Sequence, residues 1–313
     1  MRVLNFGSLN IDNVFSVQEF VRPGETLAAK SFSRGAGGKG LNQSIALARA
    51  GVSVFHAGKI GPDGIFLKET LSSDGVDVSF VDVADDEFTG SAMIQVSSSG
   101  ENCIVLYGGA NQNISREQID RVFEGFSSED ILLIQNEINS LDLIMNKASE
   151  KGMRIFFNPA PMAGNVFDLP LNSVDTFIVN EIEGAMLARS EDDVLDILHQ
   201  KYPDSHILLT LGSRGAFYLA KGECSPIFSP ACHVEKVIDT TAAGDTFTGY
   251  FISGIIRGLS PSDALSLAAQ AAALCISSPG ASSSIPAFFS VEKKAWQKKA
   301  RSGCDVAATG QGA

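Results

Sequence analysis

Two short stretches of the sequence combine glycine with polar side chains in a pattern that could hold an anion. The first is "GAGGKGLNQ" at residues 35–43, which contains the spacing G-x-G-x-x-G, and the second is "DTTAAGD" at residues 239–245. Each leads into a run with the apolar periodicity of a helix. Backbone N–H groups at the start of a helix lack intrahelical partners, and the helix dipole favours negative charge there. Both stretches could therefore approach a phosphate.

The first stretch lacks the context of a dinucleotide-binding fingerprint, which needs a strand directly before it and an acidic residue about 20 positions later. The strand-like run "RVLNFG" ends at Gly7, and the polar "AAKSFSR" precedes Gly35. The next strand-like run, "VSVFHAG", ends without a carboxylate. A phosphate-binding P-loop is also excluded, because Lys39 is followed by Gly40 where that motif needs Ser or Thr. The stretch is a glycine-rich helix start whose ligand stays open.

The second stretch is a stronger candidate for an anion site. Ala242, Ala243 and Gly244 are small and leave the backbone amides of the turn accessible, and Asp245 follows in the first turn of the helix. A first-turn carboxylate can simply stabilise the helix, by about 0.3–1 kcal/mol. From these residues alone, a structural and a chemical role for Asp245 are equally plausible.

An alternation of strands and helices must position these groups. From residue 111 onward, short apolar runs that predict strands alternate with helical patterns, and these runs are residues 131–135, 153–158, 174–180, 206–212 and 215–220. Such runs predict a mainly parallel sheet covered on both faces, whose ligands bind at the carboxyl ends of the strands. Residues 11–35 and 89–109 predict strands without intervening helices, and we expect them to form a small separate sheet.

The composition excludes several classes of protein. The chain has 313 residues and a net charge of −12, and it shows no basic stripe that could neutralise nucleic-acid phosphates. Its longest apolar run, "ALSLAAQAAALCI", is shorter than the roughly 20 residues of a membrane span. The five cysteines have no C-x-x-C spacing and the histidines are dispersed, so we expect reduced thiols, a cytoplasmic location and no zinc site.

Nine motifs in order give the sequence a strong resemblance to the ribokinase (pfkB) family of carbohydrate kinases. They are "GSLNID" (7–12), "PGET" (23–26), "GGKGLNQ" (37–43), "QNE" (135–137), "NPAP" (158–161), "NEIE" (180–183), "TLGSRG" (210–215), "DTTAAGDTFTG" (239–249) and "GASSSIP" (280–286). Each motif alone is weak, but together they are specific.

The resemblance implies a fold and a division into domains. The fold is a Rossmann-like, three-layer, doubly wound α/β domain with a mainly parallel sheet and a small β-sheet lid. The α/β domain would comprise residues 1–10, 36–88 and 110–300, the lid residues 11–35 and 89–109, and a flexible tail residues 301–313. In the family the lid often forms a dimer interface, so the resemblance implies a homodimer.

The resemblance also implies a reaction, the ATP-dependent transfer of the γ-phosphoryl group to the 5-hydroxyl of D-ribose. Deoxyribose, fructose and a nucleoside stay open as alternative acceptors. Asp245 would be the base, and the amides of Ala242, Ala243 and Gly244 would form the anion hole. The sugar would contact Asp245 and a set of polar or glycine residues, namely Asn10, Asp12, Gly38, Lys39, Gly40, Asn42 and Glu137. Asn10 and Asp12 could instead merely cap a turn.

Further positions match the family's nucleotide and cation sites. ATP would contact Asn180, Thr210, Leu211, Gly212, Ser213, Arg214, Gly215, Gly244 and Ala269. Asn180 and Glu183 would orient Mg²⁺, largely through water, although N-x-x-E is also the pattern of a helix capping box. Potassium would bind at Asp239, Thr241, Cys275, Ser278, Gly280 and Ser284.

The sequence departs from relatives at three of these places. Ala269 stands where relatives often carry Asn or His near the adenine, which predicts apolar base contacts. Pro279 stands where a bacterial ribokinase has Lys, and Ala242 stands where many members have Gly. None of these departures removes a catalytic group.

Two other classes of function compete with a sugar kinase. An NAD-dependent dehydrogenase is suggested only by the literal G-x-G-x-x-G, whose context fails. A catalytically silent sugar-binding protein would need neither Asp245 nor an open amide turn. The kinase hypothesis requires that the Lys39 turn and Asp245, far apart in sequence, face one cleft.

Overall fold

The computed structural model describes residues 1–292, so the predicted tail at 301–313 lies outside the described residues. Within this part of the chain, the larger sheet has nine strands in the order β13-β12-β11-β10-β9-β8-β1-β4-β5. The strands are β1 (Val3–Phe6), β4 (Val54–Ile60), β5 (Asp77–Val83), β8 (Ile131–Gln135), β9 (Arg154–Asn158), β10 (Thr176–Asn180), β11 (His206–Thr210), β12 (Ala216–Leu219) and β13 (Ile227–Ser229). From β11 to β5 all neighbours are parallel, and β12 runs antiparallel to both of its neighbours.

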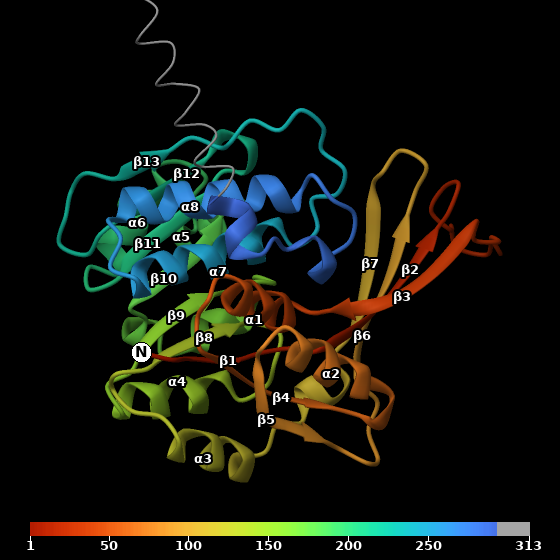
Figure 1. Ribbon diagram of the computed structural model, residues 1–313, viewed down its shortest axis with the longest axis horizontal. Helices are drawn as coiled ribbons and strands as arrows, with labels where there is room; N and C mark the ends of the chain where they lie inside the picture. The colour runs from red at the N-terminus through yellow and green to blue at the C-terminus, as the bar shows by residue number, and fades with distance from the viewer. Residues whose placement is uncertain (293–313) are drawn as a thin grey trace, which may run out of the picture.

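Helices cover both faces of this sheet (Figure 1). One face carries α1 (Lys39–Arg49), α2 (Ile65–Ser73), α7 (Ala243–Ile256) and α8 (Pro261–Cys275). The other carries α3 (Arg116–Glu124), α4 (Leu141–Glu150), α5 (Glu181–Ala188) and α6 (Val194–Lys201). Short 3₁₀ turns lie in the connections between elements or follow α8, at Pro62–Gly64, Gly109–Gln112, Gly164–Asp168, Leu171–Ser173, Gly212–Arg214 and Ser282–Ser284. None of the described helices is long and apolar enough to cross a membrane.

Two hydrophobic cores follow from the alternation of side chains along each strand. On β8, Ile131 and Leu133 belong to the core beneath α1, α7 and α8, whereas Leu132 and Ile134 belong to the core beneath α3 and α4. Both faces of such a strand must be apolar, which is why it reads as a continuous apolar run. The predicted three-layer, doubly wound α/β class is confirmed.

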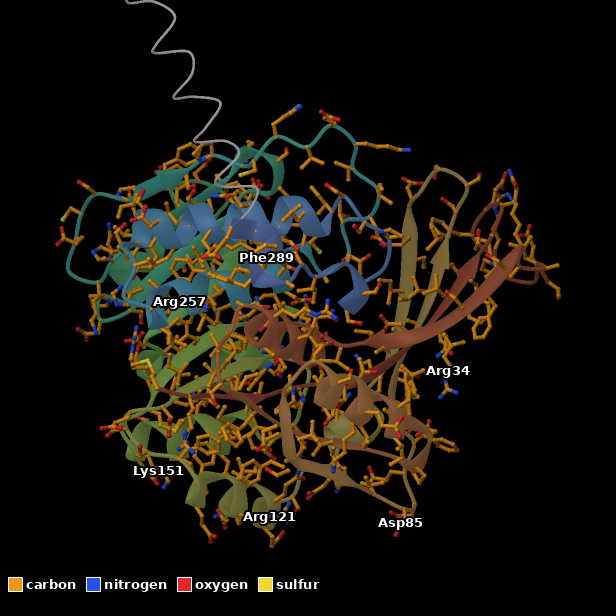
Figure 2. All side chains as sticks on the ribbon, in the orientation of Figure 1. Arg34, Asp85, Arg121, Lys151, Arg257 and Phe289 are labelled. Atoms are coloured by element: carbon orange, nitrogen blue, oxygen red, sulfur yellow. The ribbon has the colours of Figure 1, made fainter. Side chains whose placement is uncertain are left out.

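A second sheet of four strands projects from the side of the molecule, at the right of Figure 1. Its order is β3-β2-β6-β7, formed by β2 (Asn10–Ser16), β3 (Ser31–Gly37), β6 (Gly90–Val96) and β7 (Asn102–Tyr107). At its base, Arg34 of β3, labelled in Figure 2, donates to the carbonyl of Asp63 just before α2 (3.1 Å). Thr89, just before β6, donates its hydroxyl to the Asp63 carboxylate (2.7 Å). These bonds join the small sheet to the turn between β4 and α2.

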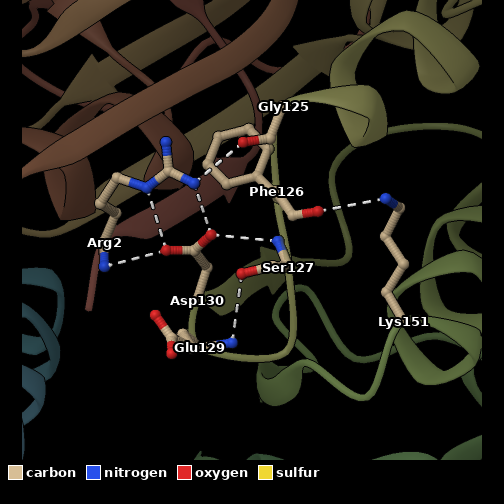
Figure 3. Close-up of polar contacts among 7 residues, drawn as sticks. All are labelled: Arg2, Gly125, Phe126, Ser127, Glu129, Asp130 and Lys151. Atoms are coloured by element: carbon tan, nitrogen blue, oxygen red, sulfur yellow. Dashed lines mark hydrogen bonds and ion pairs between the residues drawn. The ribbon is translucent and has the colours of Figure 1, made fainter.

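An ion pair fixes the amino-terminal end of the central strands (Figure 3). The Arg2 guanidinium donates to the Asp130 carboxylate through Nη2 (2.6 Å) and Nε (3.0 Å), and Ile131 N–H donates to the Arg2 carbonyl (2.9 Å). Burial alone would raise the pKa of Asp130, but hydrogen bonds from Arg2 and Ser127 hold it below its ordinary value. These contacts fix β1 and β8 relative to each other. The polar residues at the opposite, carboxyl ends of the two strands belong to the candidate active site.

Candidate active site

A cleft of about 260 Å³ opens at the carboxyl ends of the larger sheet. It lies where ligands bind in sheets of this kind. Its walls are formed by Lys39, Asn158, Ile178, Val179, Asn180, Glu183, Thr210, Thr240, Ala242, Ala243, Gly244, Asp245 and Thr248. The Lys39 turn and Asp245, which start α1 and α7, therefore face the same cleft.

Glycine allows the start of α1 to approach the end of β1. Gly38 has φ of 97°, a left-handed conformation that strongly favours glycine. A Cβ atom at Gly40 would lie 2.6 Å from the carbonyl carbon of Gly7, too close for any side chain. In return, Leu41 N–H donates to the Ser8 carbonyl (3.0 Å). The glycines of this stretch thus permit close backbone packing and do not by themselves indicate a phosphate.

The turn before α7 leaves backbone amides free at a helix start. Ala242 has φ of 60°, a left-handed conformation that costs about 1–2 kcal/mol for a residue with a Cβ. Ala243 N–H donates to the Thr240 carbonyl (3.2 Å), so this predicted member of the anion hole is already engaged. Among the described residues, the N–H groups of Ala242 and Gly244 have no acceptor. These two remain available to an anion.

The Asp245 carboxylate is buried and held by side chains of α1. Only 8% of Asp245 is exposed. Asn42 Nδ2 donates to its Oδ2 (3.1 Å), and Gln43 Nε2 donates to its Oδ1 (2.9 Å). Asn42 Oδ1 is itself buried and has no partner among the described residues. Helices α1 and α7 therefore meet through the residues that the sequence singled out, and through Gln43, which it did not.

Lys39 lies among three carboxylates. Burial alone would lower its pKa, but the negative charges of Asp245, Glu137 and Glu183 together raise it above the ordinary value. The Lys39 N–H also donates to Glu137 Oε2 (3.0 Å). The charge of the half-buried Lys39 side chain is thus stabilised by carboxylates from three different elements, and it remains charged at neutral pH.

Asn10, Asp12 and Glu137 form a second polar group next to Lys39. Burial raises the pKa of Glu137 above its ordinary value, although the hydroxyl of Ser8 and the charge of Lys39 oppose this. Burial and the nearby Glu137 charge raise the pKa of Asp12 to about 6. These carboxylates can accept hydrogen bonds from hydroxyl groups.

Asn111, which sequence reasoning missed, fixes the orientation of Asn10. Its Oδ1 accepts from Leu9 N–H (3.0 Å) and its Nδ2 donates to the Leu9 carbonyl (3.2 Å), so its amide cannot be reversed. The same Nδ2 donates to Asn10 Oδ1 (2.8 Å). Asn10 therefore keeps its Nδ2 hydrogens for another acceptor. The only signal in the sequence was an Asn close to the predicted small sheet.

Asn180 and Glu183 form the capping box of α5, as the N-x-x-E pattern allowed. Glu183 N–H donates to Asn180 Oδ1 (2.8 Å), and Asn180 N–H donates to Glu183 Oε2 (3.1 Å). Asn180 Nδ2 also donates to Glu183 Oε1 (2.9 Å). Because both carboxylate oxygens already accept amide hydrogens, this pair suits a cation that keeps most of its own water.

The residues matched to a potassium site lie together behind the turn before α7. Asp239 Oδ1 accepts from Thr241 N–H (2.9 Å), Asp239 Oδ2 accepts from Gly280 N–H (3.0 Å), and Cys275 Sγ lies 3.1 Å from Ser284 Oγ. Partial burial alone would raise the pKa of Asp239, but the bonds from Thr241 and Gly280 hold it below its ordinary value. Ser278 N–H donates to the Cys275 carbonyl (3.1 Å). A carboxylate with hydroxyl and carbonyl oxygens suits a hard cation.

Most residues matched to the nucleotide site lie outside the walls of this cleft. Asn180, Thr210 and Gly244 line it. The others are the turn after β11 and one residue of α8, namely Leu211, Gly212, Ser213, Arg214, Gly215 and Ala269. In that turn Gly215 has φ of 120° and a Cβ there would lie 2.9 Å from Pro230 Cα, so glycine is required.

Comparison with known proteins shows similarity to a protein family, to a relative in sequence and to solved structures. Residues 2–287 match the profile of the "pfkB family carbohydrate kinase". A ribokinase of Haemophilus influenzae is 36% identical over 291 residues, which span 90% of this chain and 94% of the relative.

Solved structures give the same picture. A ribokinase of Cryptococcus neoformans in complex with ADP has a TM-score of 0.85 at 34% identity, over 94% of this chain and 98% of the other. An Arabidopsis thaliana ribokinase complexed with ribose and ATP has a TM-score of 0.82 at 29% identity, over 93% of this chain and 97% of the other.

Proposed function

The chain belongs to the pfkB family of carbohydrate kinases, and from this premise we propose that it transfers the γ-phosphoryl group of ATP to the 5-hydroxyl of D-ribose. It is a phosphotransferase with an alcohol group as acceptor. The observation that carries the proposal is that Lys39, at the start of α1, and Asp245, with the turn before α7, line one cleft. The cleft thereby brings together a positive charge, a proton acceptor and free backbone amides.

Asp245 orients the 5-hydroxyl and accepts its proton. In a loose phosphoryl-transfer transition state the hydroxyl becomes acidic only as the phosphoryl group arrives, so a well-positioned carboxylate suffices as a base. The bonds from Asn42 and Gln43 fix the plane of the Asp245 carboxylate and leave lone pairs for the hydroxyl. Near-attack positioning of this kind supplies much of the rate in such reactions.

Lys39 and the turn before α7 stabilise the transferred group. The free N–H groups of Ala242 and Gly244 and the positive end of the α7 dipole face the cleft in which the phosphoryl oxygens develop charge. The Lys39 ammonium adds a full positive charge from the opposite helix. These donors are already in place before the reaction, which is the condition for electrostatic catalysis.

The sugar lies against the second polar group. Asp12 and Glu137 accept hydrogen bonds from hydroxyls, and the free Nδ2 of Asn10 donates to a sugar oxygen. Asn42 Oδ1, which has no partner among the described residues, accepts another hydroxyl. Gly38 and Gly40 contribute by letting the start of α1, which carries Lys39 and Asn42, lie close to the end of β1. Deoxyribose, fructose and a nucleoside are the alternative acceptors.

Magnesium and potassium complete the proposal. Asn180 and Glu183 would hold Mg²⁺ through its water, and the ion would supply positive charge beside the phosphates. The oxygens of Asp239, Thr241 and Ser284 would hold K⁺ beside the turn before α7. Activity that is unchanged when potassium is replaced by a large organic cation would exclude the potassium site.

We also propose that the protein is a cytoplasmic homodimer formed through the small sheet. All side chains of β7 (Asn102–Tyr107) are exposed, although Ile104, Val105, Leu106 and Tyr107 are large and apolar. A second copy would cover such a surface. A monomer at micromolar concentration in sedimentation or light scattering would contradict this assembly.

ADP release with ribose, deoxyribose, fructose and uridine tests the proposed reaction. We expect turnover to be highest with ribose and to depend on Mg²⁺. Turnover on uridine alone would replace ribose by a nucleoside. Sugar binding without ADP release would favour a silent binding protein.

A further inference from the structure

A chain of buried side-chain amides leads away from Asp245 into the core. Its central members are Gln43, Gln135 and Asn5, none of which is exposed at all. Gln43 Nε2 donates to Asp245 Oδ1 (2.9 Å), Gln135 Nε2 donates to Gln43 Oε1 (2.7 Å), and the same Gln135 nitrogen donates to Asn5 Oδ1 (3.0 Å). An amide group can be reversed in principle, so the direction of these bonds must be established from their ends.

One end of the chain is fixed by a backbone carbonyl. Asn5 Nδ2 donates to the Gly40 carbonyl (2.7 Å), which can only accept, so Asn5 Oδ1 must face Gln135. Gln135 must then donate to it, and the second hydrogen of its Nε2 goes to Gln43 Oε1. A reversed Gln135 would place its oxygen against two other oxygens with no hydrogen between them.

A second carbonyl fixes the chain independently from the other side. Asn158 Nδ2 donates to the Ile178 carbonyl (2.9 Å), so Asn158 Oδ1 must face Gln43 and accept from its Nε2 (3.2 Å). Both ends therefore require the same orientation of Gln43, with its oxygen toward Gln135 and its nitrogen toward Asn158 and Asp245. Both hydrogens of Gln43 Nε2 are used, one for each acceptor.

A branch through His56 supports this direction. His56 Nε2 lies 3.2 Å from the Gly7 carbonyl, so that nitrogen carries the proton. Burial lowers the pKa of His56 to about 4, so the ring is neutral and its Nδ1 accepts from Ser44 Oγ (2.8 Å). Ser44 Oγ in turn accepts the second hydrogen of Asn5 Nδ2 (2.8 Å). Every hydrogen on this branch has one acceptor.

We propose that Gln43 is a positioning residue for Asp245, locked by this directional chain so that it presents only donors to the carboxylate. The proposal rests on the proposed function, in which Asp245 receives the proton of the acceptor hydroxyl. Gln43 acts through Asp245 and touches neither substrate. Together with Asn42, Gln43 fixes the plane of the Asp245 carboxylate. The Gln43 amide also donates to Asn158 Oδ1, and Asn158 Nδ2 donates to Glu183 Oε2 on the phosphate side (3.4 Å).

Gln43→Met tests the proposal, because Met keeps the length of the side chain but cannot hydrogen-bond in this way. Loss of a hydrogen bond to a charged group and of the orientation it provides should lower kcat by about 10- to 100-fold. The KM for ribose should change by less than about 3-fold, since Gln43 does not contact the sugar. Gln118→Met is the matched control, because Gln118 is also buried but donates to the Gly58 carbonyl and does not contact the Asp245 chain; it should leave kcat unchanged.

The same change in an Asp245→Asn background separates positioning from a general structural effect. If Gln43 acts through the Asp245 carboxylate, Gln43→Met should lower kcat there by less than about 2-fold. Losses that multiply, or a kcat of the single variant within about 2-fold of wild type, overturn the proposal. If thermal melting shows that Gln43→Met does not fold, Gln135→Met is the alternative, because it removes the hydrogen bond from Gln135 to Gln43 Oε1. Gln135→Met should lower kcat by about 3- to 10-fold, and only in a protein that retains Asp245. A Gln135→Met protein with full kcat then overturns it.

Failure of the proposed function is recognised separately, because it appears in the unmodified protein. A wild-type protein that releases no ADP with any acceptor overturns the reaction, and the positioning role falls with it. An active wild type whose Gln43 variants behave like the Gln118 control overturns the positioning role alone.

Discussion

Replacing Gly37 by alanine should weaken sugar binding through a single displaced carboxylate. Gly37 ends β3, and its Cα faces the side chain of Asp12 on the neighbouring strand β2. A Cβ at this position would overlap the carboxyl carbon and both oxygens of Asp12. The side chain of Asp12 can rotate, so it and not the backbone would give way, by about 1 Å or more to restore normal contact.

The size of the loss in sugar affinity follows from the hydrogen bond that is lost between the Asp12 carboxylate and a sugar hydroxyl. A hydrogen bond to a charged group contributes about 1.5–3 kcal/mol, which corresponds to about 10- to 100-fold in affinity. We therefore expect the KM for ribose to rise by that factor in Gly37→Ala, while kcat at saturating ribose stays within about 3-fold. The thermal midpoint should change little, because no buried backbone contact is broken.

Gly35→Ala is the matched control in the same strand. A Cβ at Gly35 would meet no atom within 4 Å, although Gly35 is the direct partner of Asp12 in the register of β2 and β3. Steady-state ADP release over a range of ribose concentrations measures both variants. Equal KM values for Gly37→Ala and Gly35→Ala would refute the reasoning, and so would a Gly37→Ala loss that falls on kcat alone.

Four further predictions concern Asp245, Asp12 and the contact between α1 and α7. Asp245→Asn should lower turnover by at least about 100-fold and change the KM for sugar much less, and near-normal turnover in the same assay would remove Asp245 from the mechanism. The pKa of Asp12 is raised to about 6, so the KM for sugar should rise roughly tenfold between pH 7 and pH 5 in wild type but not in Asp12→Asn. A raised carboxyl pKa means that the folded protein without sugar loses stability as the pH rises from about 4 to about 6. Asp12→Asn should therefore melt at a higher temperature than wild type at pH 7, and the difference should shrink toward pH 4. Equal melting temperatures at pH 7 would contradict the presence of a buried charge on Asp12. Gly249→Ala should lower the free energy of unfolding by about 1–3 kcal/mol in a denaturant titration, because the new Cβ would lie 2.9 Å from the backbone of Ala46 where α7 crosses α1. An unchanged denaturation midpoint would mean that α1 and α7 can move apart without loss of stability.

Much of the fold was predictable because burial on two faces leaves a clear pattern. The runs 131–134 and 207–209 are apolar throughout, and only a strand covered on both sides requires that. The short edge strand β13 (Ile227–Ser229) was not predicted, since three residues, two of them exposed and one buried, carry no recognisable period. The division of the chain into domains stays a prediction, because contacts between the two sheets do not define independent units.

The candidate site was predictable only as a set of positions. The motif at 37–43 contains Lys39, Asn42 and Gln43, and spacing alone cannot distinguish a glycine that admits a ligand from one that admits a neighbouring strand. The structure shows that Gly40 packs on Gly7, and that Ala243, predicted to offer its amide, already bonds to Thr240. These facts depend on which backbone groups are left unpaired, which only the folded chain determines.

The role of Gln43 depends on atoms still further away. The direction of its hydrogen bonds is set by the carbonyls of Gly40 and Ile178, which reach it through Asn5 and Asn158. Neither carbonyl is encoded by a side chain, so no residue type at either position signals it. In a sequence, a buried glutamine is therefore indistinguishable from any other polar residue of a core. Its role becomes visible only when the surrounding hydrogen-bond acceptors allow a single orientation of its amide group. In this protein that orientation directs the Gln43 nitrogen to the Asp245 carboxylate.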